Sequence, residues 1–400
     1  MKSIAIIGGG SAACMLAAML DEEIFSIHIY EKQTAVGRKF LVAGDGGFNL
    51  THSEDIETFV TRYTPQAFLE QTLRSFTNQD LCSWLKSIGI ETYTGSSKRI
   101  FPAKGIKPIE VLNAILKKLK TKKVIIHTQH EWLGWDADNA LIFSHKEKQV
   151  IVSADKTVFA LGGASWKVTG SDGAWLNIFK EKGIRTIPFQ ASNCAYKVEW
   201  PTEFLEKAEG QWLKNISIAC EGQEKKGELV ITAFGIEGGA VYALSPQIRE
   251  QINTTGKATV FIDFKPTLIR ETLLYKISSA GNKSVSKVLS DDLKLSDTQM
   301  QLLKAFVSKE DFTDTRTLVN YIKKFPLILT ALAPIDEAIS TVGGIAIEEV
   351  NDFFELKKLP HQYVIGEMLD WDAPTGGYLL QACFSMGAGL AKQLNESKEQ

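Results

Sequence analysis

The chain has 400 residues, of which 44% are hydrophobic and 23% charged, and its net charge is −2. This length and composition predict a globular protein of roughly two or three domains with a sizeable core. A near-neutral charge does not favour a protein that binds nucleic acid through its phosphates, so we expect no nucleic-acid partner.

The number and spacing of cysteines and histidines indicate whether disulfides or metal sites are expected. The five cysteines are odd in number and form no Cys-x-x-Cys pair, so neither a disulfide framework nor a zinc site is expected. The six histidines contain no His-x-x-x-His pair, and we expect no metal site. No apolar run reaches the roughly 18 residues of a membrane span. We therefore expect a cytoplasmic protein without a membrane partner, and leave its oligomeric state open.

The N-terminal half predicts alternating strands and helices. Residues 3–31 predict a strand, a glycine turn, a helix and a second strand, and the apolar run at 4–7 is typical of a strand buried on both faces. Residues 65–88 and 108–120 have helical periodicity. Short strands are expected over 124–160, followed by a helix at about 172–182.

The texture of the sequence changes near residue 190. Residues 190–265 carry strand-like runs, and residues 266–325 are polar, helical and rich in Lys, Ser and Asp. A glycine-rich, apolar texture returns near 335 and holds to about 392. This predicts one domain that is split in sequence by an insertion at about 190–335.

The first chemical motif, residues 8–13, fits the G-x-G-x-x-G/A fingerprint of dinucleotide-binding proteins. Gly8 allows a tight turn, Gly10 lets the backbone approach a pyrophosphate, and Ala13 lets helix and strand pack closely. The following helix offers free N–H groups and about half a positive charge at its N-terminus. Glu31, at the end of the next strand, is placed to accept hydrogen bonds from an adenosine ribose and would repel the 2′-phosphate of NADP.

The fingerprint does not separate FAD from NAD, because both carry an ADP half, but two other segments favour FAD. Residues 37–39 and 44–52 form a second glycine-rich stretch, which suits backbone lying close to an extended ligand. Residues 363–390 predict a second strand, loop and helix, and the N-terminus of that helix, at about residue 379, suits the pyrimidine end of a flavin, where negative charge develops on reduction. Within this segment, Glu367 is a candidate for holding the ribityl or pyrophosphate region.

These motifs together resemble the two-dinucleotide-fold flavoproteins, and they are most similar to the HI0933-like (BaiN-type) family of NAD(P)/FAD-dependent oxidoreductases. The motifs that carry the resemblance span nearly the whole chain: residues 6–13, 37–41, 44–52, 99–102, 160–165, 170–173, 235–239, 340–344 and 366–381. The resemblance implies an α/β fold whose FAD-binding Rossmann-like domain is split into residues 1–189 and 336–400. It also implies an inserted β-rich domain, residues 190–265 and 326–335, and a small helical domain, residues 266–325, that cover the flavin.

The motifs and the resemblance together name the residues that we expect to bind FAD. They lie in glycine-rich turns, at strand ends or at helix starts: Gly8, Gly10, Ser11, Ala12, Glu31, Lys32, Gly37, Arg38, Lys39, Gly44, Gly46, Asn49, Leu50, Thr51, Ala160, Gly162, Gly163, Gly366, Glu367, Asp370, Gly376, Gly377 and Tyr378.

The chain departs from the family pattern in two loops that we expect near the flavin ring. Family members often carry Gly-Gly-Arg-Cys-Asn at residues 45–49, and Ser-Gly-Pro or a similar turn at residues 237–239. The substrates of better-known members are therefore not carried over to this chain. Glu237 is the one ionisable residue of its glycine loop, and we expect it to face the flavin and to exchange a proton as a candidate catalytic residue.

The resulting prediction is an FAD-dependent oxidoreductase that moves hydride between flavin N5 and a small organic substrate. Because the chain holds one dinucleotide fingerprint, NAD(P)H is expected at most as a donor that docks transiently, and O2 stays equally open as an acceptor. Two alternatives remain: a flavin-bearing redox-sensing or binding protein without turnover, and an RNA-modifying flavoenzyme, against which the near-neutral charge argues.

Overall fold

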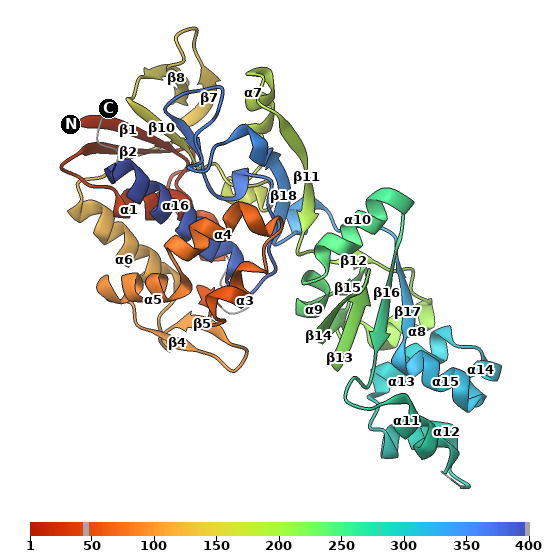
Figure 1. The fold of residues 1–400 in the computed structure, drawn as a ribbon. Coiled ribbons are helices and arrows are strands. Elements are labelled where there is room, and N and C mark those ends of the chain that lie inside the picture. The colour runs from red at the N-terminus through yellow and green to blue at the C-terminus, as the bar shows by residue number, and fades with distance from the viewer. Residues whose placement is uncertain (43–47, 280, 397–400) are drawn as a thin grey trace. The chain divides into compact units, whose positions relative to one another are not determined.

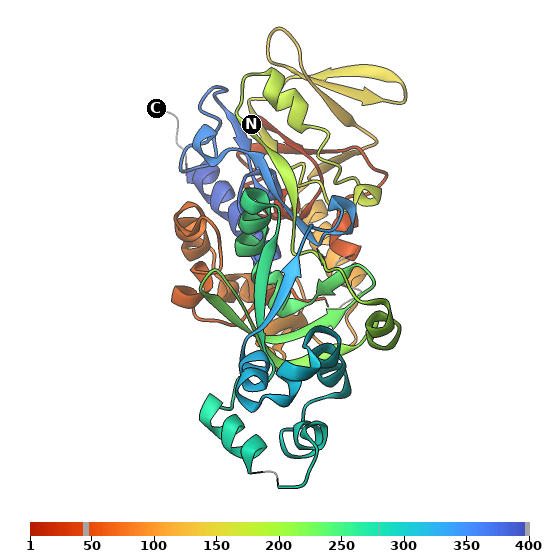
Figure 2. The same cartoon turned by 90° about the vertical axis from the view of Figure 1, so that its right-hand side faces the viewer.

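The computed structural model describes residues 1–42, 48–279 and 281–396. The chain divides into two compact units, Met1–Gln190 with Ile339–Gln400 and Ala191–Ala338, each with its own hydrophobic core. Figures 1 and 2 show the elements of each unit from two sides. The division of the chain into three domains stays a prediction.

The first unit is built on a five-stranded sheet in the order β19-β10-β1-β2-β6, and every neighbouring pair is parallel. Its strands are β1 (Lys2–Ile7), β2 (Phe25–Glu31), β6 (Ile125–Thr128), β10 (Lys156–Phe159) and β19 (Gln362–Val364). Ile4, Ile6 and Ile7 are almost fully buried, as their continuous apolar run predicts. The predicted α/β class with a parallel Rossmann-like sheet is confirmed.

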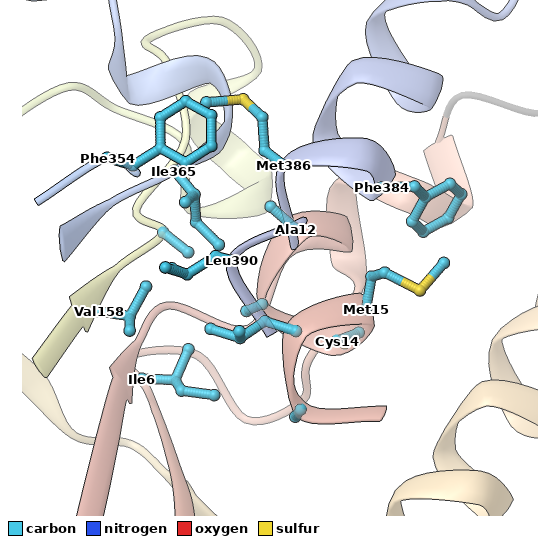
Figure 3. Packing of buried hydrophobic residues seen from close by; sticks show 14 of the residues in the cluster. Ile6, Ala12, Cys14, Met15, Val158, Phe354, Ile365, Phe384, Met386 and Leu390 are labelled. Atoms are coloured by element: carbon cyan, nitrogen blue, oxygen red, sulfur yellow. The ribbon is translucent and has the colours of Figure 1, made fainter. Parts of the chain in front are cut away.

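Helices from opposite ends of the chain pack together beside this sheet. They are α1 (Ser11–Met19) and α16 (Tyr378–Glu396), and Figure 3 shows Ala12 of the former near Met386 and Met15 near Phe384 of the latter. The helices approach closely at Gly387, where an added side-chain carbon would lie 2.6 Å from the carbonyl oxygen of Ala12. The two segments that were predicted to bind the cofactor are therefore held side by side.

The rest of the first unit surrounds this centre. Its helices are α2 (Arg38–Val42), α3 (Ile56–Val60), α4 (Gln66–Ser75), α5 (Asn78–Ser87), α6 (Pro108–Thr121) and α7 (Leu176–Glu181). Two antiparallel sheets, β3-β5-β4 and β7-β8-β9, comprise β3 (Thr51–His52), β4 (Thr92–Thr94), β5 (Arg99–Pro102), β7 (Glu131–Trp135), β8 (Leu141–His145) and β9 (Lys148–Val152). A two-stranded sheet pairs β11 (Thr186–Ser192) with β18 (Ser340–Ile345).

The helical pattern predicted over residues 65–88 is two helices in the structure. Helix α4 ends at Ser75, and Thr77 caps α5 by accepting a hydrogen bond from the amide of Asp80, whose side chain accepts one in return. Such a capping box favours a new helix start over a continuous helix.

The second unit contains a six-stranded sheet in the order β12-β15-β14-β13-β16-β17, with all neighbours antiparallel. The strands are β12 (Tyr196–Lys197), β13 (Trp212–Cys220), β14 (Gln223–Ile231), β15 (Gly235–Glu237), β16 (Ala258–Asp263) and β17 (Phe325–Leu329). Its helices are α8 (Thr202–Ala208), α9 (Gly239–Tyr242), α10 (Ser245–Thr255), α11 (Arg270–Ser278), α12 (Val285–Lys287), α13 (Asp297–Phe306), α14 (Lys309–Thr313) and α15 (Thr315–Lys323). The predicted β-rich insertion is thus present. None of the helices in the described parts of the chain is long and apolar enough to cross a membrane.

A row of stacked rings lies where β2 and β6 of the parallel sheet meet the β7-β8-β9 sheet. Tyr30 stacks on His127 at a centroid distance of 4.5 Å, and His127 also stacks on His28 at 5.3 Å. His130 and His145 continue the row with centroids 4.1 Å apart. Burial lowers the pKa of His28 and His127, and the neighbouring histidines lower the pKa of His127 further. The packing of the row therefore favours the neutral form of His28 and His127.

Candidate functional site

The turn between β1 and α1 is tightly packed at Gly8 and unobstructed at Gly10. Gly8 has a φ of +98°, and an added side-chain carbon there would lie 2.5 Å from the carbonyl oxygen of Ala160. Gly10 is exposed, and an added carbon would meet no atom within 4 Å. No described side chain caps α1, and its first turn, which begins with Ser11 and Ala12, has no acidic residue. This helix N-terminus is suited to an anionic group.

The end of β2 is tied to the same turn. One carboxylate oxygen of Glu31 accepts a hydrogen bond from the amide of Gly9 at 2.8 Å, and the other accepts one from the amide of Gln33 at 2.8 Å. Each carboxylate oxygen keeps a lone pair for a further donor, because an ionised carboxylate has about four acceptor sites. Glu31 is therefore positioned to hold a hydroxylated ligand beside the glycine turn.

Two cations after β2 reach the loop at residues 166–172. Lys32 forms an ion pair with Asp172, with 2.7 Å between Nζ and Oδ2. A hydrogen bond of 3.2 Å joins the guanidinium of Arg38 to the carbonyl oxygen of Val168. The Nε atom of Arg38 is buried and has no hydrogen-bond partner among the described residues. This loop and the end of β2 thus form the two sides of the proposed adenosine region.

A second polar cluster gathers residues from three distant segments. Lys39 donates hydrogen bonds to Ser165 at 2.9 Å and to Glu367 at 2.8 Å. The other oxygen of the Glu367 carboxylate accepts a hydrogen bond from the amide of Thr341 at 3.1 Å. Gly163 packs against this cluster, where an added carbon would collide with the hydroxyl of Thr341. The predicted residues Lys39, Gly163 and Glu367 are therefore brought together.

The glycine turn before α16 lies against β3. Gly376 and Gly377 are buried with φ values of +114° and +101°, and an added carbon at Gly377 would lie 2.5 Å from the backbone of Thr51. The hydroxyl oxygen of Thr51 is buried and has no hydrogen-bond partner among the described residues. A ligand oxygen or nitrogen that reached this turn would give the Thr51 hydroxyl a hydrogen-bond partner.

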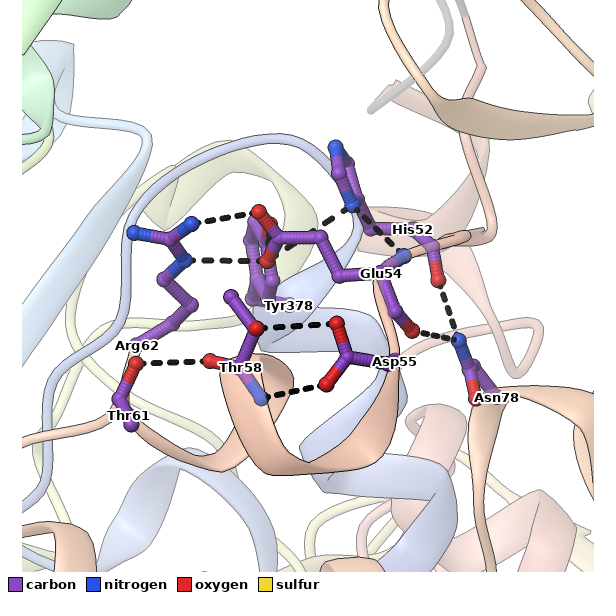
Figure 4. Close-up of polar contacts among 8 residues, drawn as sticks. All are labelled: His52, Glu54, Asp55, Thr58, Thr61, Arg62, Asn78 and Tyr378. Carbon is purple, nitrogen blue, oxygen red and sulfur yellow. Dashed lines mark hydrogen bonds and ion pairs between the residues drawn. The ribbon is translucent and has the colours of Figure 1, made fainter.

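A network of polar side chains includes Tyr378, the residue that follows this turn (Figure 4). The carboxylate of Glu54 accepts hydrogen bonds from both Nε and Nη2 of Arg62 and, at 2.7 Å, from the hydroxyl of Tyr378. The ring of His52 stacks on Tyr378 at 5.1 Å, and Asn78 donates hydrogen bonds to the carbonyl oxygens of His52 and Glu54. The network fixes the first residue of α16.

Burial sets the protonation of this network, and hydrogen bonds modify it. Burial opposes ionisation of Glu54, but the hydrogen bonds from Arg62 and Tyr378 outweigh it and hold the pKa of Glu54 below its usual value. Burial and the bond to Glu54 raise the pKa of Tyr378. Burial also lowers the pKa of His52. The network is therefore an ionised carboxylate held by one arginine, with a neutral histidine and a neutral tyrosine beside it.

The remaining predicted cofactor residues also lie in the first unit. Gly37 has a φ of +73° and packs on Leu112, Gly366 packs on Ala12, and Gly162 has a φ of +75° near Ser171. Asp370 accepts a hydrogen bond from the amide of Gly343 at 2.9 Å, which gives it a role within the fold. Asn49 and Leu50 lead into β3. Gly44 and Gly46 lie outside the described residues.

Glu237, the candidate catalytic residue, lies in the second unit at the end of β15. Its carboxylate is half-buried and accepts a hydrogen bond from the hydroxyl of Tyr242 at 3.2 Å. Burial and this carboxylate raise the pKa of Tyr242. The expectation that Glu237 faces a flavin stays a prediction.

The sequence analysis missed Glu54, Arg62 and Asn78 as members of this site. The one available signal is their place after the second glycine-rich stretch. Within the described ranges, no group of three or more His, Cys, Asp or Glu side chains could hold a metal ion, and all five cysteines are free.

The comparison with known families decides the wider assignment. The model of the HI0933-like protein Rossmann domain family matches residues 2–393. The chain belongs to this family. The match covers the parallel sheet, the glycine turns and the inserted second unit alike. The predicted family and an FAD-dependent oxidoreductase are confirmed.

Relatives of this HI0933-like protein carry two kinds of name. The chain is 26% identical over 409 residues to the 3-dehydro-bile acid delta(4,6)-reductase of Clostridium scindens, covering 97% of each chain. It is 23% identical over 398 residues to the ribosomal RNA dihydrouridine synthase of Haemophilus influenzae, covering 98% of each. In fold it is similar to the 3-ketosteroid-delta4-(5alpha)-dehydrogenase of Rhodococcus jostii RHA1, with a TM-score of 0.51, 12% identity and coverage of 100% and 97% of the two chains.

Proposed function

We propose that this HI0933-like protein reduces a carbon–carbon double bond conjugated to a carbonyl group in a small organic molecule, with FAD as its cofactor. The proposal rests on a series of glycine turns and hydrogen-bonding side chains in the first unit that could contact an extended cofactor. These run from the open N-terminus of α1 and Glu31, through Lys39 and Glu367, to the turn at Gly376 and Gly377.

The residues of this site fit FAD on their own geometry. The unobstructed backbone at Gly10 and the uncapped start of α1 suit a pyrophosphate, and Glu31 suits the ribose of the adenosine. Lys39 and Glu367 offer a donor and an acceptor for a hydroxylated chain. The orphaned hydroxyl of Thr51 offers a donor at the far end. Bound there, FAD would supply two-electron hydride chemistry.

The substrate class comes from what the relatives' names have in common. A 3-dehydro bile acid with double bonds at positions 4 and 6 has those bonds conjugated to a ketone, and uridine has its 5,6 double bond conjugated to a carbonyl. Each named reaction saturates such a bond, so hydride adds to the carbon of that bond farther from the carbonyl and a proton adds to the nearer one. We propose that the present chain acts on the same electronic arrangement.

The proton for the second carbon needs a donor from the chain. Glu237 with Tyr242 is our candidate, because the hydroxyl of Tyr242 is held by the Glu237 carboxylate in the second unit. A role for NAD(P)H as a transiently docked donor is part of the same proposal, since one dinucleotide fingerprint is present. A cytoplasmic location is also part of the proposal, and the five free cysteines agree with it.

A second candidate function, reduction of uridine in RNA, is favoured by the relative named ribosomal RNA dihydrouridine synthase. The net charge of −2 argues against it, because RNA binding relies on basic surfaces. A nucleic-acid substrate is therefore retained as the alternative outcome of the test below.

The test begins with the released cofactor and ends with the acceptor. Mass spectrometry of the denatured holoenzyme should find FAD, and finding FMN or nothing would overturn the cofactor assignment. The anaerobic enzyme, reduced with light, should then be re-oxidised by a 4,6-dien-3-one steroid or a simple cyclic enone. Re-oxidation by unmodified ribosomal RNA alone would support the second candidate. Re-oxidation by neither would favour the flavin-bearing binding protein.

A further inference from the structure

Arg99 lies at the turn that begins α16, although the sequence assigned it no role. It is the first residue of β5 and pairs across the sheet with His52 of β3. Its Nε atom lies 3.4 Å from the position that a side-chain carbon on Gly376 would take. Arg99 is half-buried. Its guanidinium therefore stands beside the Gly376–Gly377 turn.

The two arginines near this turn differ in their partners. Arg62 is neutralised by Glu54 through two hydrogen bonds. Arg99 has no ion pair and no hydrogen bond from its guanidinium to any described residue, and beside it stands His52, whose pKa is lowered. Arg99 is therefore a cation without a charged partner among the residues that the structure describes.

The location makes this cation costly in the absence of a ligand. The N-terminus of α16 carries about half a positive charge and free N–H groups, so a second positive charge beside it is unfavourable. An independent observation points the same way, since the hydroxyl of Thr51 is buried and unpartnered against Gly377. All three features would be satisfied by one electron-rich oxygen.

We propose that Arg99 binds an oxygen that gains negative charge during reduction, either on the pyrimidine ring of the flavin or on the carbonyl of the substrate. The inference rests on the proposed function. Both sources present the same chemistry, a carbonyl oxygen that becomes an oxyanion as hydride arrives or leaves. A fixed cation stabilises that charge more than the neutral ground state.

The test compares Arg99→Gln and Arg99→Lys with the wild-type holoenzyme. The control is Lys98→Asn, which removes an exposed positive charge one residue away, at a φ of +62° that asparagine tolerates. Two measurements need no turnover: the flavin midpoint potential, and the dissociation constant of cyclohexenone from the spectral change of the oxidised flavin. The FAD content of each variant is recorded first.

If Arg99 binds an oxygen of the flavin, the midpoint potential should be lower in Arg99→Gln and should partly recover in Arg99→Lys. If Arg99 binds an oxygen of the substrate, the potential should not change. The dissociation constant of cyclohexenone should then rise about tenfold or more, because a charge-assisted hydrogen bond is lost. The assignment is overturned if Arg99→Gln, loaded with FAD, changes neither quantity, or if Lys98→Asn changes them equally. A wild-type protein without FAD would instead overturn the proposed function, so the two failures are distinguishable.

Discussion

Tyr378 donates its hydroxyl proton to the carboxylate of Glu54 at 2.7 Å, which ties the first residue of α16 to the loop after β3. The same carboxylate neutralises Arg62. One ionised side chain thus holds a helix start and an arginine that are more than 300 positions apart in sequence.

Glu54→Gln should lower the free energy of unfolding by about 1–2 kcal/mol, because Arg62 would keep its charge without a charged partner. Thermal or urea unfolding measures this change. Glu57→Gln is the matched control, since Glu57 pairs with Arg74 on the exposed face of α3. An equal loss in both variants would contradict the special role of Glu54.

Gly8 and Gly10 should respond differently to the same substitution. Gly10→Val should fold with a near-normal melting temperature and yet lose FAD, because the added carbons enter the open space meant for the pyrophosphate. Gly8→Val should itself be unstable, by about 2–4 kcal/mol, since its φ of +98° and the nearby Ala160 carbonyl oppose a side chain. The checks are visible absorbance after gel filtration and calorimetry. A yellow Gly10→Val protein would remove this turn from the cofactor site.

Glu31→Ala should weaken FAD binding by about 1–3 kcal/mol, the range for losing charge-assisted hydrogen bonds. Titration of the apo-protein with FAD, followed by fluorescence, measures the affinity. Because Glu31 also accepts a hydrogen bond from Gly9, a melting curve of the apo-protein must accompany it. Glu23→Ala, an exposed carboxylate just before β2, should bind FAD as the wild type does.

The histidine row predicts a loss of stability in acid. A histidine whose pKa is lower in the folded than in the unfolded protein contributes no penalty above its unfolded pKa of about 6.5. Stability is then lost as the pH falls below that value toward the folded pKa, because the unfolded chain binds the protons more readily. Both His28 and His127 have a lowered pKa, so the melting temperature should fall as the pH drops below about 6.5.

His127→Phe should flatten this dependence, since it keeps a ring on Tyr30 but removes the titrating group. His361→Asn is the control, because His361 is exposed and has a φ of +64°, which asparagine tolerates. The amide of His130 donates a hydrogen bond to the carbonyl oxygen of Glu31 at 2.9 Å, so FAD release should accompany the acid transition. Identical pH profiles in the wild type, His127→Phe and His361→Asn would show that the row does not control the loss of stability in acid.

Glu237→Gln should slow re-oxidation of the reduced flavin by an enone while leaving FAD binding intact. The reason is that the hydroxyl of Tyr242 would lose the charged acceptor that orients it. Tyr242→Phe should reproduce the defect, and the pH dependence of re-oxidation should change in both. Unchanged rates in the two variants would exclude this pair from proton transfer.

Much of the scaffold follows from short-range patterns. The apolar run at Ile4–Ile7, the glycines at 8 and 10, and Glu31 lie within about 30 residues, where strand burial, turn geometry and helix start depend on neighbours in sequence. The parallel sheet, the first glycine turn and the β-rich character of the insertion were predictable for this reason. The family motifs extended the same prediction to the segment at 363–378.

Tertiary structure decided which polar groups are satisfied and which are left open. The pairs Lys39–Glu367 and Glu54–Tyr378, and the approach of Arg99 to Gly376, join segments more than 270 residues apart. No periodicity encodes such partners, because hydrogen bonding and charge compensation depend on the packing of distant segments. In the folded chain Arg62 pairs with the carboxylate of Glu54, whereas Arg99 has no such partner among the described residues, and that difference singles out Arg99.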